Sequence, residues 1–325
     1  MNRRLNETPV IGFFIRYFKR NMGQVVGLLL MCTIVAILTP KFLTKSNLLN
    51  LLKNCSVNAM LTCALSMVIL LGFIDISVGS TVGLAGIVSA TLITNYGWPV
   101  VPTVAVCLLI GVAVGVFNGF FIANVGVPPF ITTLVTQCLG RGLAQVICDG
   151  NPIRVRNDAF TVIGNTTING LSIIVLYALI ALIITTIILY KTKFGGYIYA
   201  VGGNRTAADY TGINSKKVII SVYVISGVLA AFCGIVWAAR LGSATPTLGA
   251  NFELDAIAAT ALGGASMSGG VLSIGGSILG ILMIGVITNG LNLLSVNSFW
   301  QYVAKGVIII IAVVIDIVRK NREDK

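Results

Sequence analysis

The sequence of 325 residues contains no histidine and few charged residues. The lack of histidine excludes His-based acid/base catalysis, His-mediated proton relays and metal sites with His ligands. Only 10% of the residues are charged, against roughly 25% in a typical soluble domain. At the same time 56% are apolar, and the mean hydropathy is +0.97. So few charges do not cover a surface in water, which excludes a soluble domain and leaves a polytopic membrane protein.

Several motifs that carry chemistry are also absent. No Gly-Lys pair is followed by Ser or Thr, so the chain has no phosphate-binding P-loop and is not by itself an ATPase of that class. There is no G-x-S-x-G nucleophile elbow. The seven cysteines are odd in number, lie mostly in apolar stretches and form no C-x-x-C pair, so neither a zinc site nor a disulfide framework follows. We therefore expect no catalytic residue, no metal site and no cofactor in this chain.

Long uncharged runs predict the membrane-spanning segments. A helix needs about 20 apolar residues to cross about 30 Å of hydrocarbon, and clusters of Gly, Pro and Asn divide the longer runs. The sequence predicts ten spans near 21–40, 54–74, 78–94, 101–123, 130–148, 171–190, 218–239, 255–267, 274–294 and 299–318. The expected fold is all-α: a single transmembrane domain over 1–325 with about ten helices, some of them short or broken.

The positions of Lys and Arg predict the orientation. Ten spans place both termini on one side of the membrane. With that side cytoplasmic, the cytoplasm holds five basic residues in the tail 1–20, five in 191–217 and four in the tail 319–325, against six in the outer segments. This excess follows the positive-inside rule. The net charge of +12 therefore reflects topology rather than nucleic-acid binding, since no basic patch is interleaved with aromatic residues.

A few polar residues in or near the spans are candidates for a translocation path. They are Asn58, Asp75, Ser77, Asn118, Glu253, Asp255 and Asn289. The alternative for the carboxylates is an interfacial or capping position, and for most of the others hydrogen bonding between helices. Arg141 and Lys305 lie within spans, where snorkelling or structural pairing is favoured over ligand binding.

The segment 191–217 is a long, basic and amphipathic connection on the predicted cytoplasmic side. Asn204 is a good N-cap for a short helix over 205–210, the Gly202-Gly203 pair allows a tight turn, and Gly212 suits a helix stop. These features predict a short helix that two spans hold just outside the bilayer. It either lies on the membrane surface or docks as a lever in a groove of a soluble partner.

Six short motifs follow one another along nearly the whole chain. They are Ser56–Met60, Gly72–Ser80, Pro129–Leu134, Ala200–Asn204, Glu253–Ala259 and Asn289–Leu294. Each alone is weak, but their order and spacing are specific, and together they resemble the permease subunit of bacterial ABC importers for ribose and related monosaccharides, including xylose, arabinose and galactose. Phe73 and the pair Met267-Ser268 depart from the family pattern, which bears on the choice of sugar more than on the family.

The resemblance implies a multi-pass permease of the bacterial inner membrane, most closely one for ribose or a related pentose. It implies a homodimer whose 191–217 segments dock on a separate ATP-binding cassette ATPase, with an extracytoplasmic sugar-binding protein on the outer face. The residues expected to couple to the ATPase are Gly195, Gly202, Gly203, Asn204, Arg205, Ala207, Ala208 and Gly212.

Two alternatives remain at this point. One is a secondary transporter of a small polar solute driven by an ion gradient, and the other is a structural or signalling membrane subunit. The long basic cytoplasmic segment and the shortage of acidic residues inside the spans argue against the ion-coupled carrier.

Overall fold

The computed structural model describes residues 21–297, 299–307, 310 and 314. Its longer helices are α2 (Met22–Leu38), α3 (Lys45–Leu70), α4 (Val78–Thr94), α5 (Val100–Phe120), α6 (Pro129–Ile147), α8 (Ile173–Lys191), α9 (Lys193–Gly203), α11 (Ser215–Leu241), α12 (Phe252–Leu262) and α13 (Ile274–Leu293). Shorter elements are the 3-10 turn Pro40–Leu43, the π-type turn Phe121–Val125, α7 (Asp158–Asn165) and α10 (Arg205–Tyr210). The predicted tails 1–20 and 319–325 lie outside the described residues.

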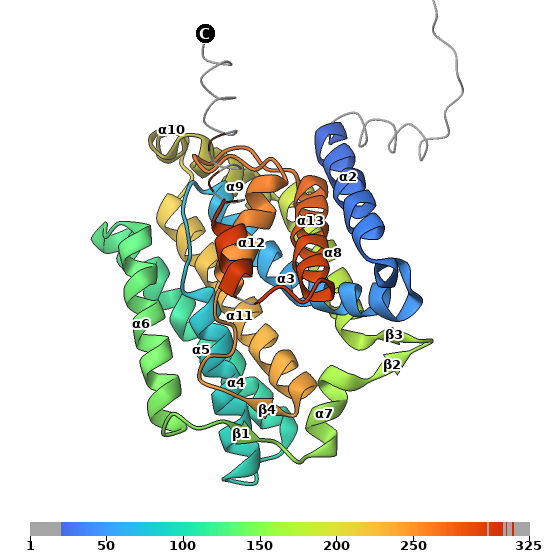
Figure 1. Cartoon of the computed structure of the whole chain (residues 1–325). Helices are drawn as coiled ribbons and strands as arrows, with labels where there is room; N and C mark the ends of the chain where they lie inside the picture. The colour runs from blue at the N-terminus through green and yellow to red at the C-terminus, as the bar shows by residue number, and fades with distance from the viewer. Residues whose placement is uncertain (1–20, 298, 308–309, 311–313, 315–325) are drawn as a thin grey trace, which may run out of the picture.

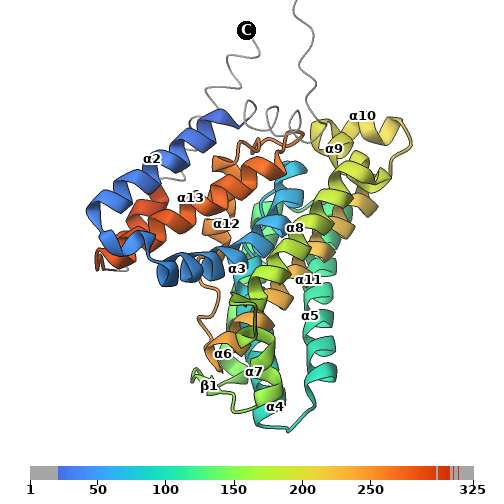
Figure 2. The same ribbon diagram turned by 90° about the vertical axis from the view of Figure 1, so that its right-hand side faces the viewer.

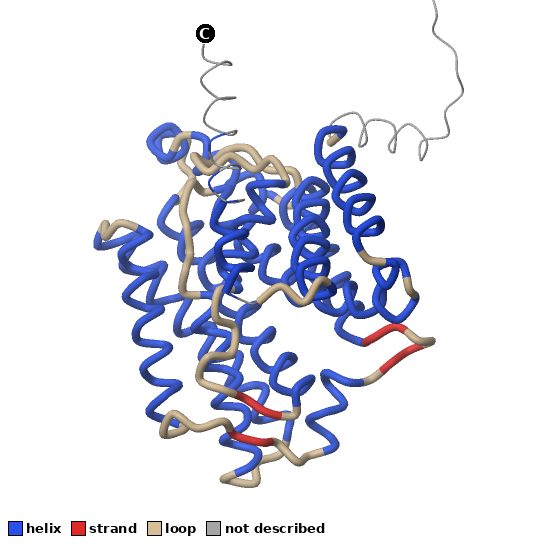
Figure 3. Tube along the Cα trace, viewed as in Figure 1, coloured by secondary structure: helices blue, strands red, loops and turns tan. Residues whose placement is uncertain are grey.

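The all-α prediction is confirmed. Each of the first nine predicted spans contains a helix; in the tenth, 299–307 is helical, while much of the rest lies outside the described residues. Among the described residues, five helical segments are long and apolar enough to cross a membrane, namely α3, α5 with its π-type extension, α8, α11 and α13, and α2 and α4 are shorter apolar helices. Strands form only two short antiparallel pairs in this part of the chain, β1 (Ile153–Arg154) with β4 (Ser243–Ala244) and β2 (Thr167–Ile168) with β3 (Leu171–Ser172) (Figure 3).

The predicted start of the second span was wrong. Helix α3 begins at Lys45, nine residues before the predicted start at 54. Lys53, the charged residue just before the uncharged run at 54–74, is half-buried within the helix. A single charged residue therefore does not end the helix.

Helix α11 is the centre of the molecule. It packs against α5, α4 and α3, and α6 packs in turn on α4. A second group, α2, α12 and α13, lies to one side of α3, and Figure 2 shows the two groups forming an angled shape with α3 between them. The short helices α9 and α10 lie at one end of the molecule, and β1, β4 and α7 lie at the other (Figures 1 and 2).

The contact between α5 and α11 depends on three glycines spaced four residues apart, Gly111, Gly115 and Gly119. A Cβ atom on Gly115 would overlap the carbonyl oxygen of Tyr223, and one on Gly119 would lie 2.7 Å from the Cα of Ile220. Because lipid tails are as apolar as Leu, helices in a bilayer associate through such close van der Waals packing. The small-residue stripe thus sets the distance between these two helices.

We predict that Gly115→Leu destabilises the protein, because the new side chain has no space between α5 and α11. Overpacking of this kind costs about 1–3 kcal/mol of unfolding free energy. The measurement is thermal unfolding in detergent, with Gly142→Leu as the matched control, because a Cβ on Gly142 meets no atom within 4 Å. Equal melting temperatures for the two variants would contradict the role of the stripe.

Candidate functional site

The segment 191–217 forms two helices, α9 and α10, between α8 and α11 (Figure 1). The Asn204 side chain caps α10, since its Oδ1 accepts a hydrogen bond from the backbone N–H of Ala207 at 2.9 Å. Gly212, with φ +87°, lies in the turn after α10. The predicted helix over 205–210, its N-cap and its stop are confirmed.

The predicted turn at Gly202-Gly203 was wrong. Both residues belong to α9, and the chain changes direction at Asn204, whose backbone is extended with φ −158° and ψ 104°. Thr192 caps α9 by accepting a hydrogen bond from the N–H of Gly195 at 3.2 Å. The four glycines of 193–203 suggested a loop, but the packing of Ile198 and Val201 against the core favours the helix here.

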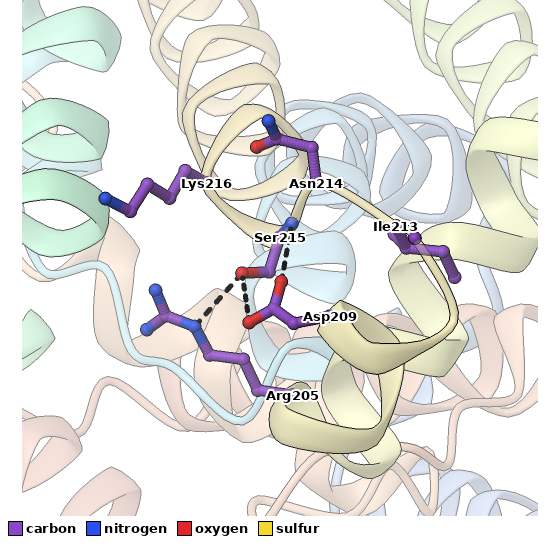
Figure 4. Close-up of a pocket in the computed structure, with 7 residues that line it drawn as sticks. Arg205, Asp209, Ile213, Asn214, Ser215 and Lys216 are labelled. Carbon is purple, nitrogen blue, oxygen red and sulfur yellow. Dashed lines mark hydrogen bonds between the residues drawn. The ribbon is translucent and has the colours of Figure 1, made fainter.

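Three side chains fasten α10 to the start of α11 (Figure 4). The backbone N–H and the hydroxyl of Ser215 donate to the two carboxylate oxygens of Asp209 at 3.2 and 3.1 Å, and Arg205 Nε donates to the same hydroxyl at 3.2 Å. The Ser215 hydroxyl, with help from the charge of Arg205, holds the pKa of Asp209 below its usual range. The clamp is therefore fully present at neutral pH and is lost only as the pH falls through that lowered pKa.

The outer surface of this segment is basic and carries an exposed aromatic residue. Tyr210, at the end of α10, is 87% exposed. The surrounding exposed cations are Lys191, Lys193, Arg205, Lys216 and Lys217. Of the predicted coupling residues, Gly203, Asn204, Arg205, Ala207 and Gly212 are exposed, whereas Gly195 and Ala208 are buried and Gly202 is half-buried. The segment thus has one exposed, basic face, and its other face packs on the rest of the protein.

Three of the predicted path residues meet at the beginning of α4. The Asp75 carboxylate accepts hydrogen bonds from the backbone N–H of Ser77 at 2.9 Å and from its hydroxyl at 2.5 Å. The amide of Asn118, on α5, donates to the Ser77 hydroxyl at 2.9 Å. All three residues are at most 2% exposed. They are therefore a buried polar cluster rather than separate groups.

Sequence reasoning missed two members of this cluster, Ser226 and Thr136. Ser226, on α11, donates to the other Asp75 oxygen at 3.0 Å, and Thr136, on α6, donates to the amide oxygen of Asn118 at 2.5 Å. Isolated Ser and Thr residues in apolar helices give no sequence signal, because their partners are distant along the chain. The cluster joins α4, α5, α6 and α11 through hydrogen bonds.

Asn58 and Asp255 form a second pair. The Asn58 side chain hydrogen-bonds the Asp255 carboxylate, and Lys305 Nζ lies 2.7 Å from Asp255 Oδ1 in an ion pair. Arg141 Nη1 donates to the carbonyl oxygens of Pro246 and Leu248 at 3.0 and 2.6 Å. Snorkelling or structural pairing was the favoured interpretation for Arg141 and Lys305, and these contacts support structural pairing.

The remaining two path candidates are Glu253, which lies near Arg141 and Asp255, and Asn289. Glu253, on α12, accepts a hydrogen bond from Gln137 at 3.3 Å. Asn289, on α13, exchanges two hydrogen bonds of 2.9 Å with Asn47 on α3. In the described part of the chain, no three His, Cys, Asp or Glu side chains gather in a way that would hold a metal ion. Each of the path candidates thus makes a polar contact within the protein.

Comparison with known proteins decides the family. The profile of a family described as the permease component of the branched-chain amino acid transport system matches residues 47–313. The chain belongs to this permease family. The permease is thus a transport component rather than a catalytic one, and its apolar helices indicate a multi-pass protein of the inner membrane.

Curated relatives of the permease cover nearly its full length. It is 38% identical over 315 residues to a ribose import permease of Haemophilus influenzae, covering 96% of this chain and 97% of the relative. It is 41% identical over 301 residues to a ribose import permease of Bacillus subtilis (91% and 92% covered). It is 38% identical over 328 residues to a galactose/methyl galactoside import permease of Escherichia coli (95% and 97%). No solved structure matches the chain.

We predict that Ser226→Ala destabilises the permease more than Ser89→Ala. The first change removes a donor from the buried Asp75 carboxylate, and an unsatisfied buried group costs about 1–3 kcal/mol. Ser89 is the matched control, because it is equally buried but its hydroxyl donates only to the Gly86 carbonyl of its own helix. Thermal unfolding in detergent measures both variants, and equal losses would show that the cluster adds nothing.

Proposed function

We propose that this permease is the membrane subunit of an ABC importer for a monosaccharide, ribose or a related pentose. The observation that carries the proposal is the near full-length similarity to ribose import permeases. In this proposal a separate ATPase supplies the work, an extracytoplasmic binding protein delivers the sugar, and two copies of the chain, each a single transmembrane domain, form a homodimer. Both termini and the segment 191–217 lie in the cytoplasm.

The geometry of α9 and α10 supports docking of the ATPase at this end. The segment projects beyond the membrane helices, and its clamp of Arg205, Asp209 and Ser215 gives α10 a fixed position on α11 (Figure 4). Its exposed cations and the exposed Tyr210 ring favour a partner groove with acidic residues and space for one aromatic side chain. A fixed helix transmits a push better than a flexible loop.

The path residues support weak binding of the sugar by the permease itself. Asn58, Asp75, Ser77, Asn118, Glu253, Asp255 and Asn289 remain the proposed contacts, and each already makes a hydrogen bond within the chain. A sugar hydroxyl that met one of them would replace an existing bond, so the net gain falls below the about 0.5–1.5 kcal/mol of a newly formed hydrogen bond. Selectivity then resides in the binding protein.

We predict that replacing both Gly203 and Asn204 with Leu abolishes sugar uptake and ATPase stimulation while the permease still assembles. A side chain at Gly203 meets no atom of the permease within 4 Å, so it projects toward the partner, and loss of the Asn204 cap weakens α10 by about 1 kcal/mol. Uptake of labelled sugar into proteoliposomes holding the ATPase and binding protein is the measurement. Gly23→Leu, also in open space, is the control, and normal uptake in the double variant would remove the coupling role.

The opposite end of the molecule offers basic residues to the binding protein. Arg154 and Arg156 are exposed on and beside β1, whereas Arg240 is engaged, with a 3.0 Å hydrogen bond to Asn54 and its guanidinium 4.5 Å from the Trp237 ring centroid. Exposed charges at the rim of an interface act mainly on association rate and salt dependence.

We therefore predict that Arg154→Glu with Arg156→Glu weakens binding of the extracytoplasmic partner by roughly three- to tenfold at low salt, with the difference fading at high salt. Binding to permease in nanodiscs across a salt series is the measurement. Lys216→Glu, at the other end, is the control, since it leaves this affinity unchanged. If the double variant and the wild-type permease bind the partner with the same affinity at every salt concentration, Arg154 and Arg156 are not part of the interface.

A further inference from the structure

Three segments far apart in the sequence meet at the end of α9. They are the end of α9 (Gly202 and Gly203), the turn that follows α3 (70–72) and the loop between α12 and α13 (263–273). The backbone N–H of Gly270 donates to the carbonyl oxygen of Leu70 at 2.9 Å, which joins the last two segments directly. At this contact Gly202 is half-buried and Gly203 is exposed.

The meeting point is backbone against backbone. A Cβ on Gly202 would overlap the carbonyl oxygen of Leu70. One on Gly269 would lie 2.7 Å from the carbonyl oxygen of Gly202 and 2.8 Å from the N of Gly72. Gly72 and Gly269 also have φ values of +79° and +88°, which favour glycine on conformational grounds. The nearest neighbouring atoms at these positions all belong to the backbone.

Two tyrosines hold the same loop from the side. The Tyr199 hydroxyl, on α9, donates to the carbonyl oxygen of Leu272 at 3.5 Å, and the Tyr190 hydroxyl, on α8, accepts from the N–H of Ile274 at 3.4 Å. Their rings lie 6.5 Å apart between centroids. The start of α13 is thus attached to α8 and to α9, the first helix of the segment 191–217.

Each segment leads to a point where a membrane helix is interrupted. The turn after α3 runs into Asp75 and Ser77, which hold α5, α6 and α11 through the buried polar cluster. The loop after α12 separates α12 from α13. A displacement of α9 therefore acts on both interruptions at once. Closely packed backbone has no rotamers that would absorb such a displacement.

We propose that Gly202, with Gly72, Gly269 and Gly270, forms a glycine joint through which movement of α9 and α10 reaches the α3–α4 turn and the α12–α13 loop. This inference rests on the proposed function, because it assigns the route by which work from the ATPase enters the membrane helices. The glycines are positioning residues: they contact neither sugar nor nucleotide. A side chain at the joint changes how far each helix moves for one turn of ATP hydrolysis.

The test is the number of ATP molecules hydrolysed per sugar taken up, measured in proteoliposomes with the complete complex and radiolabelled ribose. Gly202→Ala is the test variant, and Gly196→Ala is its matched control on the same helix, because a Cβ on Gly196 meets no atom within 4 Å. We expect Gly202→Ala to bind the ATPase and hydrolyse ATP but to raise the ratio by about tenfold or more, as overpacking disturbs the joint. Gly196→Ala keeps the wild-type ratio.

A second variant keeps the test decisive where Gly202→Ala fails to assemble. Tyr190→Phe with Tyr199→Phe removes two hydroxyls and retains both rings, so the fold loses little. We expect the ratio of ATP to sugar to rise by about two- to fivefold, because the variant loses only two weak hydrogen bonds. If Gly202→Ala does not assemble, a wild-type ratio of ATP to sugar in the double tyrosine variant overturns the joint. If both variants assemble, a wild-type ratio in both overturns it.

Two other results are informative. Loss of ATPase binding by an assembled Gly202→Ala permease overturns the joint, because the contact then shapes the docking surface rather than transmitting movement. Failure of the proposed function looks different: the wild-type chain alone accumulates solute on a sodium or proton gradient, without ATPase or binding protein. That result contradicts both proposals. If the wild-type permease takes up sugar normally with ATP, and the variants keep its ratio of ATP to sugar, only the joint is contradicted.

Discussion

Helices in a bilayer gain nothing by hiding apolar side chains from lipid, so close approach of backbones and shared polar contacts must hold them together. The permease satisfies this constraint with glycine at the closest helix crossings, such as Gly115 on Tyr223 between α5 and α11 and Gly280 on Ala259 between α13 and α12. Polar contacts supplement this packing at a few buried places. The positions of α9 and α10 depend on this packing, because both short helices contact the longer helices whose spacing the glycines set.

The polar contacts are few and concentrated. The cluster around Asp75 ties four helices together, and the ion pair of Lys305 with Asp255 connects α12 to the helical stretch at 299–307. Asp75 lies between α3 and α4, where its carboxylate accepts hydrogen bonds from the N–H and hydroxyl of Ser77 and from the hydroxyl of Ser226. Asp255 lies in the first turn of α12 and binds Lys305 and Asn58. The two buried carboxylates therefore lie at or near the ends of helices.

Sequence alone located the helices well where breakers and apolar runs agree, as for α4 at 78–94 and for α13, predicted at 274–294 and observed at 274–293. It failed where local composition and tertiary packing disagree. The glycines of α9 suggested a turn, but burial of Ile198 and Val201 makes that stretch a helix. The sequence indicated Asp75, Ser77 and Asn118 as separate candidates. It did not show that they form one cluster with Thr136 and Ser226, because those contacts join residues 18 to 151 positions apart.

The glycine crossings also restrict how this molecule can change over evolutionary time. At an ordinary core position, a larger residue on one helix can be offset by a smaller one opposite. Where Gly111 of α5 faces the backbone of Gly227 on α11, neither side has an atom to give up. Substitutions are thereby directed away from the helix crossings, toward positions such as the exposed side chains of α6, where exchange does not move a neighbour.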